Sequence, residues 1–184
     1  MSVPASDQAV IRPMVYADIP SVLDLERRLF PHDAWPEAFF WDELASSPAN
    51  PDLPGHALTR RYWVAAEPER TPGAGETILG YAGLMCVLPL ADVQTIAVAG
   101  ESQGQGLGTA LLHRIIDSAA DAGAEQLLLE VRADNDGAQS LYRREGFETI
   151  HSRPRYYGDG ADALIMRKTL REPAAHSSAS DLRS

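Results

Sequence analysis

Residues 92–132, DVQTIAVAGESQGQGLGTALLHRIIDSAADAGAEQLLLEVR, contain a strand pattern, a glycine-rich loop, a helix pattern and a second strand pattern. After the loop, apolar residues recur at helical spacing, at Leu107, Leu111, Ile115 and Ala119. Gly123 ends this helix, and residues 126–132 then alternate between two faces as a strand does. A strand, a helix and a strand in this order predict a parallel crossover within one sheet.

The sequence on either side predicts the other elements of the same sheet. Residues 62–66 and 78–88 are typical of strands and should be antiparallel, because the Pro- and Gly-containing segment 68–77 joins them as a hairpin loop. Further strands are expected at residues 11–13, 147–152 and 163–168, and further helices at residues 18–29, 36–45 and 138–145. This order predicts an α/β (α+β) fold with a single mixed, mostly antiparallel sheet, a central parallel crossover and about four flanking helices.

Length and composition predict one globular domain. The 184 residues are 45% hydrophobic and 23% charged, which is ordinary for a chain with a single core. Residues 1–8 show no pattern and are expected to be flexible. Residues 171–184 are rich in Ser and Ala without a hydrophobic period, so we expect a disordered tail after a domain over residues 9–170.

The charge balance narrows the class of partner. With 26 acidic and 16 basic residues the net charge is −10, which repels nucleic acid and favours an amine, a basic peptide or a basic protein. Cys86 is the only cysteine and the five histidines lack a ligand spacing, so we expect neither a disulfide nor a metal site. Without a secretion signal or an apolar run of about 20 residues, a cytoplasmic protein with no membrane contact is expected. The oligomeric state stays open.

The glycine loop, QGQGLG at residues 103–108, has a geometry suited to phosphate. A P-loop requires the motif GxxxxGK[ST] and a dinucleotide-binding loop requires the motif GxGxxG. The loop at residues 103–108 matches neither motif. The loop therefore suits the pyrophosphate of another cofactor, unless it is only a turn that needs glycine.

The pattern Gln103-x-x-Gly106-x-Gly108, after a strand and before an amphipathic helix, resembles the acyl-CoA loop of the GNAT acetyltransferases. The resemblance is dense over residues 95–166 and looser over residues 11–88. Its later part resembles the ribosomal-protein-alanine N-acetyltransferases of this family, through residues 129–132 (LEVR), Asn135, Ala138, residues 141–142 (LY), 146–147 (GF) and 155–157 (RYY), Asp162, Ala163 and Met166.

The resemblance implies a GNAT-like domain that uses acetyl-CoA as co-substrate and no metal. Backbone groups of Ile96, Ala97 and Val98 would flank the pantetheine and the acetyl carbonyl, with the Val98 N–H as an oxyanion donor. Backbone N–H groups of the loop would hold the pyrophosphate, at Gly104, Gln105, Gly106, Leu107, Gly108 and Thr109. Asn135 suits a helix cap by its residue type, and the resemblance adds a contact to the cofactor.

The resemblance also assigns the acid and the base. Glu130 would be the general base, directly or through water; the alternative is an ion pair with Arg132 on the same face of its strand. Helices should cover this strand, so a carboxylate there points to a role. Tyr142 would be the general acid; the alternative is a core aromatic residue.

The implied function is N-terminal acetylation of a protein, with the N-terminal alanine of a small-subunit ribosomal protein as acceptor. The alternatives are a GNAT enzyme that acetylates a small amine or a Lys side chain, and a module that binds acyl-CoA without catalysis. Arg155, Tyr156 and Tyr157 either wall the acceptor or pack as an aromatic hairpin, and for Trp35 and Phe39 core packing is the expected role. The loop at residues 48–60 could border the substrate.

Overall fold

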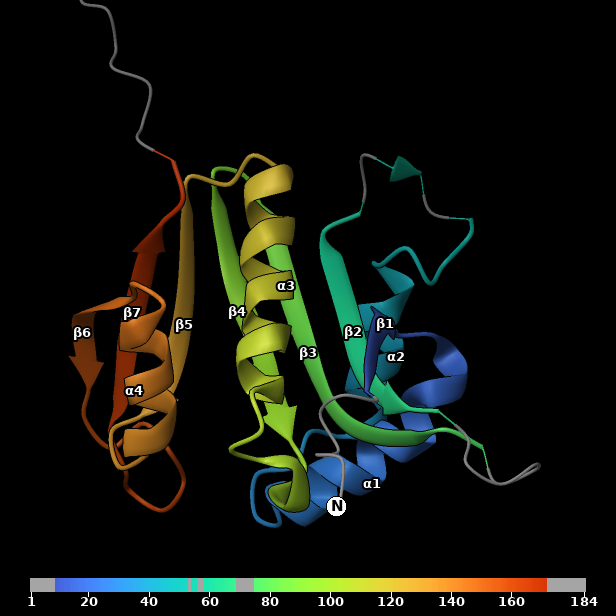
Figure 1. Ribbon diagram of the computed structural model, residues 1–184. Coiled ribbons are helices and arrows are strands. Elements are labelled where there is room, and N and C mark those ends of the chain that lie inside the picture. The colour runs from blue at the N-terminus through green and yellow to red at the C-terminus, as the bar shows by residue number, and fades with distance from the viewer. Residues whose placement is uncertain (1–8, 53, 56–57, 69–74, 172–184) are drawn as a thin grey trace, which may run out of the picture.

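The computed structural model describes residues 9–52, 54–55, 58–68 and 75–171 and contains one seven-stranded sheet (Figure 1). The strands are β1 Val10–Pro13, β2 Arg60–Glu67, β3 Thr77–Val87, β4 Leu90–Val98, β5 Gln126–Arg132, β6 Glu148–Arg153 and β7 Ala163–Thr169. Their order across the sheet is β1-β2-β3-β4-β5-β7-β6. Every neighbouring pair is antiparallel except β4 and β5, which are parallel, so the predicted mixed sheet is confirmed.

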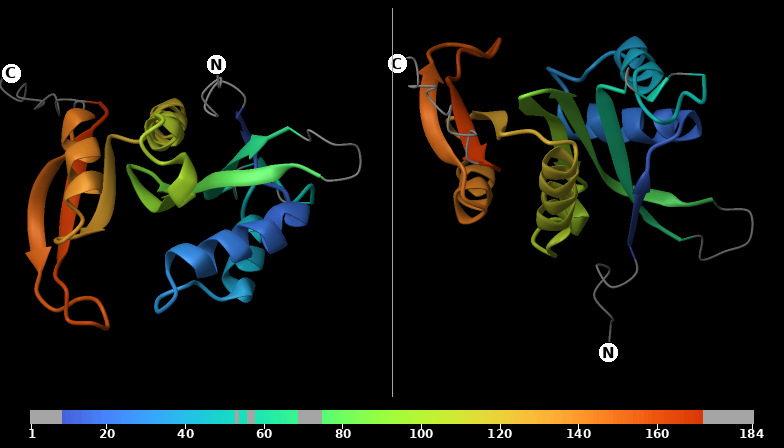
Figure 2. Two further views of the ribbon diagram at one scale, coloured as in Figure 1. Left: turned by 60° about the horizontal axis from the view of Figure 1, so that its bottom comes forward. Right: turned by 90° about the horizontal axis from the view of Figure 1, so that it is seen from above.

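Four α-helices cover the sheet, two on each face (Figure 2). On one side lie α1 (Ile19–Leu29) and α2 (Glu37–Ala45), and on the other lie α3 (Leu107–Asp121) and α4 (Asp136–Arg144). Short 3-10 segments, Tyr16–Asp18 and Gly100–Ser102, precede α1 and follow β4. Each helical layer buries its own apolar cluster against the sheet, as the periodicity predicted.

Asp18 precedes α1 and is a residue type that favours helix caps, but it has a different role. Its side chain makes no cap hydrogen bond to this helix. It accepts two hydrogen bonds from the Arg12 guanidinium, at 2.8 Å each, and one from the Val15 N–H at 2.9 Å. The bidentate pair ties β1 to the start of α1.

The feature that positions the site is the separation of β4 from β5. The two strands pair only through Leu90 with Gln126, Ala91 with Leu127 and Asp92 with Leu128. Beyond these residues the strands diverge, as Figure 1 shows. An irregularity in the pairing with β3 places Gln94 between two partnered residues of β4, and such a bulge bends a strand. The backbone edges of both strands are therefore free of each other over the second half of β4.

The exposure of Glu130 corrects one prediction. β5 is interior to the sheet, with Leu127, Leu129 and Val131 buried on the α3 and α4 side. On the opposite face α1 and α2 contact β3 and β2 rather than β5. The expectation that helices cover this face of the strand is wrong, and the side chain of Glu130 is 36% exposed.

Two further expectations concern the ends of the chain. The flexible N-terminus at residues 1–8 and nearly all of the predicted tail, residues 172–184, lie outside the described residues. Among the helices that are described, none combines the length and the apolar character needed to cross a lipid bilayer.

Candidate active site

The glycine loop borders a cavity of about 610 Å³ beside the diverging strands. We call it the glycine-loop cavity; its lining is Ile96, Ala97, Val98, Gln103, Gly104, Gly106, Gly108, Thr109, Asn135, Gly137, Ala138, Leu141, Tyr142 and Arg144. Eight of the ten residues predicted to bind the cofactor are in this lining; Gln105 and Leu107 are outside it. The Leu107 side chain is buried in the core, and the Gln105 amide donates to the Glu101 carbonyl at 3.0 Å.

The backbone of the loop is shaped for an anion. Gly104 and Gly106 have φ values of 74° and 84°, a left-handed conformation that side chains rarely adopt, so these glycines are required by the turn itself. Gly106 is the N-cap of α3, and no side chain caps this helix. The first helical bond runs from the Ala110 N–H to the Gly106 carbonyl, so the N–H groups of residues 107–109 stay free of helical bonds. Uncapped N–H groups at a positive helix end bind phosphate well.

The free edge of β4 supplies further donors. The Ala99 N–H donates to the Leu79 carbonyl of β3 at 2.8 Å, and alternate residues of a strand direct their backbone groups to opposite neighbours. Val98 therefore directs its N–H and carbonyl away from β3, and the Gln103 side-chain amide donates to that carbonyl at 3.0 Å. The Val98 N–H lies on the same edge, toward the gap between β4 and β5.

Several residues of this cavity were missed by the sequence analysis. Asn135 acts as predicted for a helix cap, with its Oδ1 accepting from the Ala138 N–H at 3.0 Å, and it also lines the cavity. Ala138 and Leu141 are among the residues that carry the resemblance, but they were not predicted to line the cavity. Gln103 is part of the loop motif but was not predicted to bind the cofactor. Arg144 carried no signal, because its approach to the cavity depends on how α4 packs.

Tyr142 is both a core residue and a cavity residue. It is only 5% exposed, its ring meets Phe147 edge-on at 5.8 Å, and it contacts the glycine-loop cavity. In the described part of the chain its hydroxyl makes no hydrogen bond to protein. Burial, with a smaller effect from Tyr157, raises the pKa of Tyr142 to about 12, so the phenol is protonated at neutral pH.

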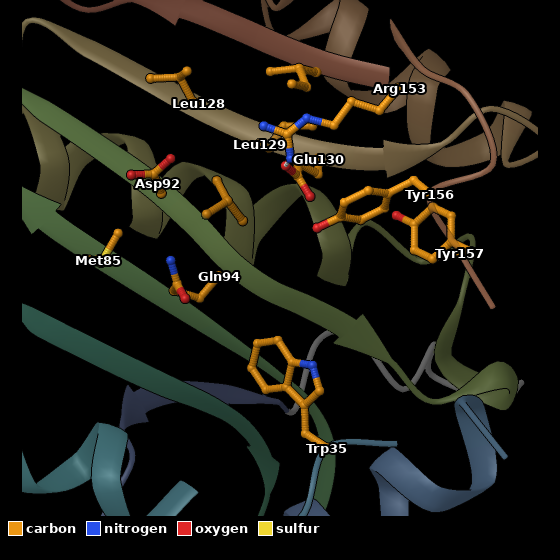
Figure 3. A pocket seen from close by; sticks show the side chains of 12 residues that line it. Trp35, Met85, Asp92, Gln94, Leu128, Leu129, Glu130, Arg153, Tyr156 and Tyr157 are labelled. Atoms are coloured by element: carbon orange, nitrogen blue, oxygen red, sulfur yellow. Dashed lines mark hydrogen bonds and ion pairs between the residues drawn. The ribbon is translucent and has the colours of Figure 1, made fainter. Parts of the chain in front are cut away.

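On the other side of the gap lies an open groove of about 540 Å³, which we call the Glu130 groove (Figure 3). Its lining is Trp35, Met85, Asp92, Val93, Gln94, Leu128, Leu129, Glu130, Arg153, Tyr156, Tyr157 and Ile165. Arg153 Nη1 donates to Glu130 Oε1 at 2.7 Å, and Figure 3 shows the Tyr156 hydroxyl directed toward the same carboxylate. Its hydrogen bond to Glu130 raises the pKa of Tyr156.

The ion pairs around Glu130 exclude one of the earlier alternatives. Arg132 pairs with Asp134 at 2.9 Å and with Asp159 at 2.7 Å, so the expected alternative of an ion pair between Glu130 and Arg132 is wrong. The actual partner of Glu130, Arg153, lies on β6, 23 residues along the chain.

Aromatic side chains form part of the groove wall. Tyr156 and Tyr157 line it and meet edge-on at 5.2 Å, whereas Arg155 is outside the lining. That these residues wall the acceptor stays a prediction. Trp35 packs on Phe39 at 4.0 Å as expected and also lines the groove. The described residues of the 48–60 loop are absent from the lining of the groove, so the expectation that this loop borders the site is not supported.

A third cavity, of about 300 Å³, shares lining residues with both of the others. Its lining includes Glu130 of the groove, Tyr142 of the glycine-loop cavity, and Thr95 and Ile96 of β4. An anionic ligand on the glycine loop and a second ligand in the groove can thus meet between a carboxylate and a protonated phenol. That arrangement suits a group transfer with a base on one side and an acid on the other.

Comparison with known proteins agrees with this geometry. The model of the Acetyltransferase (GNAT) family matches residues 19–147. N-alpha-acetyltransferase RimI of Mycobacterium tuberculosis is 36% identical over 92% of this chain and 98% of that protein. Uncharacterized protein ML0378 of Mycobacterium leprae is 37% identical over 89% of this chain, which spans 41% of that protein. The crystal structure of the ribosomal-protein-S18-alanine N-acetyltransferase from Escherichia coli matches with a TM-score of 0.71 and 28% identity, over 91% of this chain and 97% of that one. The chain therefore belongs to the GNAT family of acetyltransferases.

Proposed function

We propose that this acetyltransferase moves the acetyl group of acetyl-CoA to the α-amino group of a protein, with the N-terminal alanine of a small-subunit ribosomal protein as acceptor. The proposal is supported by the third cavity, whose lining includes both Glu130 and Tyr142 and shares residues with the glycine-loop cavity and the open groove. The relatives support the acceptor, since they include an N-alpha-acetyltransferase and an enzyme named for the alanine of ribosomal protein S18. The net charge of −10 suits a basic protein.

The glycine-loop cavity fits acetyl-CoA. The uncapped N–H groups of residues 107–109 would hold the pyrophosphate, and the guanidinium of Arg144 adds positive charge to the same lining. The free edge of β4 would hold the pantetheine arm, and the Val98 N–H would face the acetyl oxygen. When bound, acetyl-CoA supplies an activated acetyl thioester.

Glu130 would accept a proton from the acceptor. An α-ammonium group has a pKa of about 7.7 to 8.0, so much of it is protonated at neutral pH and cannot attack until it loses a proton. The Glu130 carboxylate reaches the third cavity from the groove side, and it is open to solvent, which can carry the proton away. Arg153 holds one carboxylate oxygen and so orients the other.

Tyr142 would supply a proton to the leaving group, the sulfur of CoA. Its phenol stays protonated at neutral pH because burial raises its pKa to about 12. The hydroxyl can therefore donate a proton to the sulfur that departs as the new amide forms.

Glu130→Gln removes the base and keeps the size of the side chain. At pH 7 we expect kcat to fall by about 10² to 10⁴, with acetyl-CoA affinity unchanged. The difference in kcat between the variant and the native enzyme should become smaller as the pH rises through about 8. Above that pH most of the acceptor amine is already unprotonated, so the base is no longer needed. The measurement is kcat of the native enzyme and of Glu130→Gln at pH values from 6 to 9.

The control is Arg153→Gln, which breaks the same ion pair and keeps the carboxylate. Because the carboxylate remains, the fall in kcat at pH 7 should be much smaller than in Glu130→Gln, and it should shrink in the same way as the pH rises. If Glu130→Gln loses the same factor at every pH, Glu130 is not the base.

Tyr142→Phe removes only the hydroxyl, which has no hydrogen-bond partner among the described residues. We expect the free energy of unfolding in urea to change by less than about 0.5 kcal/mol, since the contact with Phe147 is kept. The value of kcat should fall by about 10² or more. A variant with full activity would leave Tyr142 as a core residue alone.

The acceptor is tested with short peptides that differ in one feature: a free or blocked N-terminus, alanine or another first residue, and an internal Lys. Incubation with acetyl-CoA and mass spectrometry should show acetylation of free N-termini, led by alanine. The α-amine loses its proton far more readily than a Lys side chain, whose pKa is about 10.4. Modification of Lys, or of small amines alone, would contradict the proposal.

A further inference from the structure

Asp92 lies at the point where β4 and β5 part, as the last β4 residue paired with β5. Its half-buried side chain lines the Glu130 groove at the end away from Tyr156 and Tyr157, as Figure 3 shows. The proposed mechanism leaves this carboxylate without a role.

The carboxylate of Asp92 has no partner in the described part of the chain. Arg60, the cation that acts on it, already pairs with Glu43 at 2.8 Å, and Arg153, which lines the same groove, pairs with Glu130 at 2.7 Å. Among the residues that line the groove, the charged ones are Asp92, Glu130 and Arg153. The groove therefore carries one uncompensated negative charge, and it resides on Asp92.

The surroundings of Asp92 make that charge unfavourable without a ligand. Burial and the nearby Glu130 carboxylate raise the pKa of Asp92, and a smaller opposing effect comes from Arg60, which is paired with Glu43. The attraction of a cation in the groove would offset both effects. Apolar side chains of Met85, Leu128 and Ile165 line the same groove, and the methylene stem of a Lys or Arg side chain packs well on such a surface.

The spacing along β4 places this charge within reach of an acceptor's second residue. Asp92 precedes Ile96 by four residues, which is at most about 13 Å along a strand. In an extended acceptor with its amine near Ile96, the second Cα lies about 3.8 Å beyond the first. A short side chain would stop before Asp92, whereas Lys and Arg are long enough to approach it.

We propose that Asp92 is a specificity-determining residue that selects acceptors whose second residue is Lys or Arg, by pairing with the cationic end of that side chain in the Glu130 groove. This inference rests on the proposed N-terminal acetylation and specifies the second residue of the acceptor. It assigns the two carboxylates of the groove different tasks: Glu130 acts on the amine and Asp92 on the next side chain.

The test uses peptides that begin with Ala and differ only in the second residue: Arg, Lys, Gln or Glu. For the native enzyme we expect kcat/KM to be about tenfold higher with Arg or Lys than with Gln, and lowest with Glu. Asp92→Asn should remove this preference, mainly through a higher KM for the basic peptides. The Gln peptide should be acetylated within about twofold of the native rate, which also shows that the variant is folded.

Asp117→Asn is the matched control, because it removes one unit of charge from an exposed position on α3, outside the groove lining. It should keep the preference for basic second residues. Equal kcat/KM for Arg and Gln in the native enzyme, or an equal loss for all peptides in Asp92→Asn, would overturn the inference while leaving N-terminal acetylation intact.

Binding separates this inference from the proposed function. The Kd of each peptide is measured by calorimetry with CoA present, so that no turnover is needed. Tighter binding of the Arg peptide that is lost in Asp92→Asn supports the role of Asp92 even if no peptide is acetylated. Equal Kd values for the Arg and Gln peptides would overturn it whatever the activity.

Discussion

The site depends on one constraint: β4 and β5 pair through only three residue pairs and then separate. A central gap in a sheet leaves backbone N–H and carbonyl groups without their usual partners, which is unfavourable unless something else bonds them. At this gap the partners are side chains from the flanking elements. Gln103 donates to the Val98 carbonyl of β4, and Gln139 donates to the carbonyls of Arg132 and Ala133 at the end of β5. The strand edges remain apart, and donors such as the Val98 N–H stay available to a ligand.

The helices hold the two halves of the sheet in place around the gap. Leu111, Leu112 and Ile115 of α3 are fully buried in the cluster that also contains Leu127 and Leu129 of β5. This cluster spans both diverging strands, so they cannot close without loss of apolar burial. The same packing directs the first turn of α3 toward the gap and brings Tyr142 of α4 to its edge. Two cavities on opposite sides of the sheet therefore meet at one point.

Sequence patterns predicted what local periodicity determines. The strand, glycine loop, helix and strand of residues 92–132 follow from apolar spacing and from glycines that, in the structure, have positive φ. The exposure of Glu130 could not be predicted, because it depends on where α1 and α2 pack rather than on β5 itself. The pairing of Glu130 with Arg153 could not be predicted either, since these residues come together only when β6 and β7 complete the sheet. Asp92 looked like an ordinary first residue of a strand, and its unpaired charge is visible only beside the groove.

The central claim is that a CoA thioester and a protein N-terminus meet through the gap between β4 and β5. A bisubstrate compound, with the sulfur of CoA joined through an acetyl group to the amine of a peptide that begins with alanine, tests it by calorimetry. If the two cavities connect as described, the compound should bind at least about 10²-fold more tightly than CoA or the peptide alone, because the second half binds intramolecularly. A Kd equal to that of CoA would show that the groove does not receive the acceptor and would contradict the account.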